Sequence, residues 1–174
     1  MTKRSSLAVD DLKVSPFTVL GKDWMLLTAG SFKEASFNTM TVGWGALGTM
    51  WNKPFVMVVV RPGRYTYEFT EKFDSFTLTA FSADLQDKLK YLGSHSGRDS
   101  DKIAESDLTP EASTVVDAPT FAEAELAMEC RKIYFDDFNP ENFLADYIAK
   151  QYNNDFHRMY FGEIIALSAT EKYT

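Results

Sequence analysis

The hydrophobic positions of this 174-residue chain mark many short strands and few helices. Six segments rich in β-branched, methionine and aromatic residues are predicted as strands: residues 25–28, 39–45, 55–60, 75–81, 125–135 and 159–167. Three short segments have helical spacing: residues 65–72, 84–92 and 98–106. A small, six-stranded antiparallel barrel fits this order better than a doubly wound sheet, which needs regular alternation of strands and helices. We therefore predict a mainly β fold with flanking helices.

Three segments predict how that sheet is built. In residues 75–81, apolar side chains alternate with threonines, as in a half-buried antiparallel strand. Residues 55–60 are apolar throughout, which predicts a strand covered on both faces. Residues 125–135 alternate until Lys132 and Ile133, where the phase is lost. This loss of phase predicts a β-bulge.

Three glycines, Gly43, Gly45 and Gly48, match the GxGxxG spacing of dinucleotide-binding units. That motif works only where a helix begins at its last glycines and directs its N–H groups at a pyrophosphate. Pro54 and the strand-like residues 55–60 follow instead. We interpret the glycines as a feature of sheet geometry, a bulge or a close backbone approach.

Length, charge and composition exclude several classes of protein. A chain of 174 residues predicts one domain, residues 1–174. The net charge of −7 disfavours a nucleic-acid surface, so any anionic ligand must be held locally. The longest apolar run, residues 55–60, is far shorter than the roughly 20 residues of a membrane helix. Asp10 and Asp11 interrupt any signal-peptide core, and we expect a cytoplasmic location.

Cysteine and histidine are too few for familiar thiol or metal chemistry. The single Cys130 cannot form an internal disulfide, and His95 and His157 lie far apart in the sequence. No Ser/His/Asp or Cys/His set is recognisable, so we assign no catalytic residue and no metal. An enzyme of this kind would rely on a cofactor.

Two cationic turns are candidate phosphate sites. In the first, Arg61, Arg64, Tyr65 and Thr66 surround the start of a predicted helix, where N–H groups, a hydroxyl and guanidinium groups can bind phosphate. The alternative is an ordinary capped turn with solvated arginines.

The second turn spans residues 94–102, SHSGRDSDK, and also precedes a predicted helix. Arg98 and Lys102 are four residues apart, which would place both on one helix face. The alternative is that they only balance neighbouring acidic residues on a solvated helix.

The strand after Asn38 offers a place for a planar ring. Its period of two places bulky residues on one face, namely Asn38, Met40, Val42 and Trp44. Small residues occupy the other face, namely Thr39, Thr41, Gly43 and Gly45. A ring could lie along that open face, although a tryptophan such as Trp44 is more commonly plain core. His157, before the last strand, could donate to a ligand oxygen or cap the strand.

Four ordered motifs within residues 16–164 carry a resemblance: NTMTVGWGALGTMWNKP, VRPGRYTYEFTEK, LGSHSGRDSDKIAESDLTP and FHRMYFGEI. Together they resemble the flavoredoxin branch of the flavin reductase-like family. The resemblance implies a split β-barrel that binds FMN at its surface, usually at a homodimer interface. It also implies that electrons pass through the flavin from NAD(P)H or from a redox protein.

The resemblance also implies which residues surround the cofactor. Those bordering the ring and ribityl chain would be Asn38, Met40, Thr41 and Trp44. Those serving the phosphate would be Arg61, Tyr65 and Thr66, with Ser96, Gly97, Arg98 and Lys102 closing over it. His157 would approach the ring, and Lys102, Arg98 or His157 would stabilise its anionic reduced form. Gly43 departs from the family pattern, because relatives often have a small hydroxyl residue there.

The sequence leaves several functions open. A flavin reductase releases reduced flavin, whereas an electron carrier keeps FMN tightly bound. A binding module would hold a flavin without turnover. An oxidase of pyridoxamine phosphate shares the barrel architecture but ranks last, because its motifs are not those of this chain.

Overall fold

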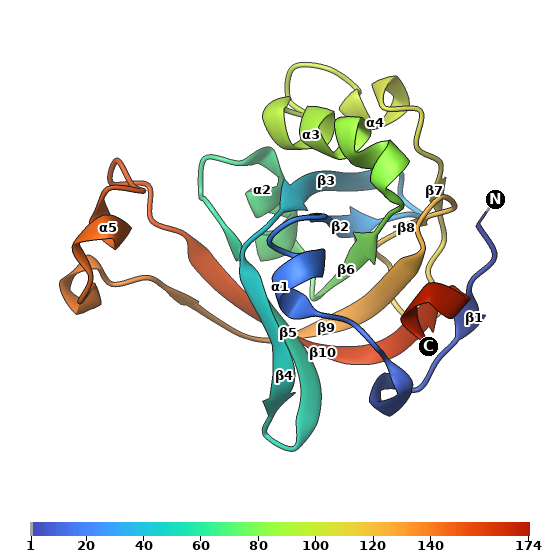
Figure 1. The fold of residues 1–174 in the computed structure, drawn as a ribbon. Helices are drawn as coiled ribbons and strands as arrows, with labels where there is room; N and C mark the ends of the chain where they lie inside the picture. Colours follow the sequence, from blue (N-terminus) through green and yellow to red (C-terminus); the bar gives the residue numbers. More distant parts are fainter. Residues whose placement is uncertain (1) are drawn as a thin grey trace.

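The computed structural model describes residues 2–174 and shows a mainly β fold with short flanking helices (Figure 1). One antiparallel sheet contains eight strands: β1 (Ser5–Ser6), β2 (Met25–Ser31), β3 (Ser36–Val42), β4 (Gly45–Met50), β5 (Lys53–Val60), β6 (Ser75–Ala80), β9 (Leu126–Asp137) and β10 (Arg158–Ala169). A separate hairpin pairs β7 (Pro110–Glu111) with β8 (Thr120–Phe121). The helices are α1 (Pro16–Val19), α2 (Tyr65–Lys72), α3 (Gln86–Ser94), α4 (Lys102–Glu105) and α5 (Asp146–Ala149). All six predicted strands are present, together with β4 and the short β1.

The strand order is β3-β2-β6-β9-β10-β5-β4, with β1 paired to β10. The sheet curls on itself, and the evidence is one apolar cluster that contains valines of β5 together with side chains of β2 and β6. β3 and β4 remain the two ends of the hydrogen-bonded path, so the barrel is split. This arrangement confirms the predicted split β-barrel and leaves β3 as an edge strand.

The two longest strands bend so that each contributes to both halves of the sheet. The first half of β9 pairs with β6, whereas the first half of β10 pairs with β5. The pairing of β9 with β10 shifts register between Phe161 and Gly162, where Ile133 is left unpaired. The predicted bulge is therefore confirmed. A Cβ on Gly162 would lie 2.4 Å from the Phe76 ring, so this bend requires glycine.

Two strand predictions are wrong in detail. The predicted strand 39–45 ends at Val42, and Gly45 begins the new strand β4, which forms a hairpin with β5. Gly45 and Gly48 lie inside β4, so the glycine motif starts no helix. The strand predicted to be half-buried, β6, is instead buried on both faces. A loop covers the threonine face, where the Thr77 hydroxyl donates to the Pro119 carbonyl at 2.6 Å. Residues 55–60 are mostly buried, as predicted.

The predicted helix 98–106 is also wrong, because α4 contains only Lys102–Glu105. The Asp101 carboxylate accepts from the Ala104 N–H at 3.2 Å and fixes the helix start at Lys102. Arg98 therefore lies in a turn, exposed, whereas Lys102 is buried. The predicted helix 84–92 is shifted, since a 3₁₀ turn over Ala83–Leu85 precedes α3.

The chain between β9 and β10 forms an arm that carries α5 and projects away from the barrel (Figure 1). At its base the Phe138 N–H donates to the His157 carbonyl at 3.1 Å. At its tip Leu144 is 97% exposed. Within residues 2–174, the helices are all too short to cross a membrane.

Candidate functional site

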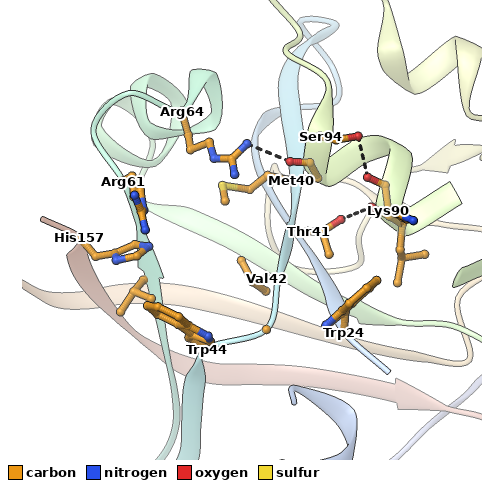
Figure 2. A pocket seen from close by; sticks show the side chains of 14 residues that line it. Trp24, Met40, Thr41, Val42, Trp44, Arg61, Arg64, Lys90, Ser94 and His157 are labelled. Atoms are coloured by element: carbon orange, nitrogen blue, oxygen red, sulfur yellow. Dashed lines mark hydrogen bonds between the residues drawn. The ribbon is translucent and has the colours of Figure 1, made fainter. Parts of the chain in front are cut away.

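A cavity of about 390 Å³ opens beside the edge strand β3 (Figure 2). Met40 and Val42 of β3 lie at its centre, between two walls. One wall contains Trp24 and α3, and the other contains Arg61, Trp44 and His157. The volume falls within the range of about 300–1,000 Å³ that is typical of small-molecule sites.

The open face predicted for β3 is covered by α3. The Thr41 hydroxyl donates to the Leu89 carbonyl of α3, and a Cβ on Gly93 would lie 3.0 Å from the Thr41 side chain. This face of β3 is therefore packed against α3 at Thr41, although Thr41 and Gly43 still line the cavity. The cavity follows the outer edge of β3, where the backbone groups of an edge strand can pair with a ligand.

A second, smaller cavity of about 110 Å³ adjoins the first. Met40, Arg64 and Ser94 line both cavities. The polar residues that line the smaller cavity are Asn38, Arg64, Tyr65, Thr66, Ser94, His95, Ser96 and Lys102. We call the two cavities together the β3 groove, with an aromatic end at Trp44 and His157 and a polar end at Thr66 and Lys102.

Lys102 is a buried cation at the polar end, with an exposed fraction of 3%. Its ammonium donates to the carbonyl oxygens of Leu92 and His95, at 2.8 and 3.0 Å, at the C-terminus of α3. Within residues 2–174 no carboxylate forms an ion pair with it. Burial, and then the charge of Arg64, lower the pKa of Lys102 to about 8. An ammonium has three protons, so one remains for a further acceptor.

Asn38 and Thr66 join the strand to the helix at this end. The Asn38 amide donates to the Thr66 hydroxyl at 2.8 Å, and both side chains are buried. The hydroxyl proton of Thr66 is therefore free for a ligand in the smaller cavity. The first turn of α2 also offers N–H groups that have no partner within the helix.

The two arginines near the polar end differ in their partners. Arg64 donates to the Gly93 carbonyl at 2.9 Å and faces the groove (Figure 2). Arg98 pairs with Glu68 at 2.5 Å and lies over the Tyr65 ring at 4.9 Å. The charge of Arg98 is compensated by Glu68 outside the groove, whereas no carboxylate of residues 2–174 forms an ion pair with Arg64.

The aromatic end is built from the barrel and from the base of the arm. Trp44, which is 49% exposed, lies 5.3 Å from the His157 ring. Burial, and then the charge of Arg61, lower the pKa of His157 to about 4, so its imidazole is neutral at pH 7. The imidazole therefore contributes hydrogen bonding and no positive charge.

The structure brings most of the predicted site residues to the groove. The larger cavity contains Met40, Thr41, Trp44, Arg61 and His157. The smaller cavity contains Asn38, Met40, Tyr65, Thr66, Ser96 and Lys102. Gly97 and Arg98 line a neighbouring hollow together with Asn38 and Tyr65.

Three placements differ from the predicted roles. Arg61 lies at the aromatic end and does not line the smaller cavity. Arg98 and Lys102 lie toward the polar end and line no part of the larger cavity, so they are not placed to stabilise a reduced ring there. The neutral His157 adds no charge either. Sequence reasoning missed Trp24 and Lys90, because loop and helix positions carry no motif that points to a groove.

The protein is a split barrel whose edge-strand groove has a buried cation at one end and an aromatic wall at the other. Residues 21–172 match the family model described as "Flavin reductase like domain". The chain therefore belongs to the flavin reductase-like family.

Solved structures with the same fold include two flavoredoxins. That of Methanosarcina acetivorans is 26% identical, with a TM-score of 0.69 over 87% of this chain and 70% of the other. That of Desulfovibrio vulgaris (Miyazaki F) is 23% identical, with a TM-score of 0.66 over 86% and 70%. An FMN-binding protein from Thermus thermophilus is 21% identical, with a TM-score of 0.68 over 97% and 83%. No curated protein matches. These matches confirm the family and its flavoredoxin branch.

Proposed function

We propose that the β3 groove binds FMN, with the phosphate at the polar end and the isoalloxazine ring at the aromatic end. The observation that carries this proposal is Lys102, a buried ammonium whose hydrogen-bond partners within residues 2–174 are carbonyl oxygens alone. A buried charge without a counter-charge is costly, and a phosphate would supply that counter-charge. The fold supports the same ligand, because a Thermus thermophilus protein of this fold is named FMN-binding.

Each part of the groove suits one part of FMN. The Lys102 ammonium, the Thr66 hydroxyl and the start of α2 would bind phosphate oxygens. The free edge of β3 would hydrogen-bond the ring, and Trp44 would lie against it. Bound FMN supplies two-electron redox chemistry that no side chain of the site can provide. The protein orients the ring, limits water around it and keeps His157 neutral.

The direct test is the ligand itself. Protein purified with its yellow chromophore should release FMN, and not FAD, when denatured. Protein purified without flavin should bind added FMN more tightly than riboflavin. FMN binding no tighter than millimolar would contradict the proposal.

We propose further that the bound flavin accepts electrons from NAD(P)H or from a redox protein. The half-exposed Trp44 supports an open ring that a donor can reach. NADH or NADPH should then bleach the flavin absorbance near 450 nm, a property of flavin itself. A reductase turns over added FMN many times, whereas a carrier does not. Reduction by dithionite alone would favour a carrier or a non-catalytic flavin-binding module.

A homodimer is the expected assembly. Aromatic side chains gather where the β4–β5 hairpin meets β9 and β10. The exposed Trp51 lies 6.1 Å from the exposed Tyr134 and 6.4 Å from the partly buried Phe161. Exposed apolar surface of this kind is characteristic of an interface. Light scattering at micromolar concentration should give twice the mass of one 19.7 kDa chain. A monomeric mass with FMN bound would contradict this assembly.

A further inference from the structure

Arg61 joins the projecting arm to the barrel. One of its Nη atoms donates to the Asp155 carboxylate at 2.5 Å, and the other donates to the Gln151 carbonyl at 2.9 Å. The guanidinium also lies 5.3 Å from the centre of the Tyr152 ring. A planar guanidinium can hold two acceptors at once in a fixed geometry, which a single ammonium does less well.

The arm has few other attachments. Its aromatic residues pack on one another, with Phe143 contacting Phe138, Tyr152 and Phe156. Among the side-chain hydrogen bonds of residues 2–174, those that link residues 139–156 to the barrel proper come from Arg61. The Asn153 N–H donates to the second carboxylate oxygen of Asp155 at 2.9 Å and orients it toward Arg61.

The contacts that hold the arm also position the aromatic wall of the groove. His157 ends the arm, and its Nδ1 lies 3.0 Å from the Tyr152 hydroxyl. On its other side, the imidazole lies 5.3 Å from the Trp44 ring. In Figure 2, Arg61, His157 and Trp44 follow one another along a single wall of the cavity. A movement of the arm would therefore move His157 and open the aromatic end.

We infer that Arg61 is a positioning residue: it fastens the arm to the barrel through Asp155 and Gln151, and thereby fixes the aromatic wall that contacts the flavin ring. This inference rests on the proposed binding of FMN in the groove. It gives Arg61 a different role from the phosphate contact that the family resemblance implied. An arginine whose charge is already paired with a carboxylate is a poorer partner for a second anion.

The variant Asp155→Asn separates the two roles, because Asp155 does not line the groove. If Arg61 fastens the arm, the variant should weaken FMN and riboflavin binding by the same factor, about threefold to tenfold, as expected for loss of a charged hydrogen bond at a half-exposed pair. If Arg61 binds phosphate, the variant frees it. FMN binding would then be unchanged or tighter and riboflavin binding unchanged, and this result would overturn the inference.

A matched control is Glu68→Gln. Glu68 also forms an exposed 2.5 Å pair with an arginine, Arg98, but this pair lies near the polar end. The control should leave riboflavin binding unchanged. Equal weakening of riboflavin binding by both variants would overturn the inference, because the effect would then not be specific to the arm.

A second measurement does not depend on flavin. In flavin-free protein, Asp155→Asn should speed limited proteolysis within residues 139–156 without lowering the unfolding temperature of the barrel. Unchanged proteolysis would overturn the inference. If the wild-type protein binds neither flavin, the proposed function fails, and faster proteolysis of the variant would still show that Asp155 and Arg61 fasten the arm.

Discussion

The two ends of the β3 groove are built in different ways. The polar end combines β3, α2, α3 and α4, and its Asn38, Thr66 and Lys102 side chains are buried and hydrogen-bonded. The aromatic end combines barrel residues with the base of the arm, and Trp44 there remains half-exposed. Buried, satisfied polar groups are held rigidly, whereas loops adapt more easily. For the proposed FMN, the polar end would therefore hold the phosphate in one position, and the aromatic end would leave the ring within reach of an electron donor.

The largest expected effect tests the polar end directly. Lys102→Met removes the charge while retaining a long apolar side chain, and should weaken FMN binding by about 10- to 150-fold, the equivalent of 1.5–3 kcal/mol for a charged hydrogen bond. Riboflavin, which lacks the phosphate, should bind as before. The control is Lys22→Met, which should leave both affinities unchanged, because Lys22 is exposed and lines neither cavity of the groove. Fluorescence titration measures the affinity of each variant for FMN and for riboflavin. An equal loss of FMN and riboflavin affinity in Lys102→Met would contradict the division of the groove into a polar and an aromatic end.

The rigidity of the polar end can be tested with two glycines. A Cβ on Gly97 would lie 2.5 Å from the Asn38 side-chain oxygen, whereas a Cβ on Gly63 would meet no atom within 4 Å. Gly97→Ala should therefore lower the free energy of unfolding by about 1–3 kcal/mol, as overpacking does. Gly63→Ala should leave it nearly unchanged. Urea denaturation of both variants measures the difference, and equal stabilities would show that this end is not tightly packed.

The pH dependence of FMN binding should report on Lys102. Its pKa is lowered to about 8 in the ligand-free protein, and a bound phosphate would raise it by favouring the charged form. FMN affinity should therefore fall as Lys102 loses its proton around pH 8, by about tenfold between pH 7 and 9. Riboflavin binding and the Lys102→Met variant should show no such fall over this range. An FMN affinity that rises with pH would contradict the assignment.

The smallest expected effect concerns the aromatic end. Trp44→Leu should weaken FMN and riboflavin binding equally, by about 2- to 12-fold, which corresponds to 0.5–1.5 kcal/mol for an aromatic pair. The unfolding temperature should change little, because Trp44 is half-exposed. A selective loss of FMN would place Trp44 near the phosphate and reverse the orientation of the ligand in the groove.

Local patterns were sufficient for much of the fold. The predicted strands and the bulge at Ile133 depend on side-chain alternation, which is visible in the sequence. The helix predicted over residues 98–106 was too long, because one carboxylate, that of Asp101, decides where the helix begins. The burial of the β6 threonines depends on a loop far along the chain, whose Pro119 carbonyl accepts from Thr77. The alternation of residues within β6 cannot show which distant loop will cover the strand.

The sequence by itself determined the family, the strand pattern and which residue types gather near the proposed phosphate site, because these depend on spacing along the chain. Only the tertiary structure decided how each charge is used. Within residues 2–174, Lys102 is a buried cation without a carboxylate partner, Arg98 is paired with Glu68, and Arg61 is paired with Asp155, 94 residues away. Such pairings depend on how the sheet curls and where the arm returns to the barrel, and three similar cations in a sequence therefore acquire three different roles.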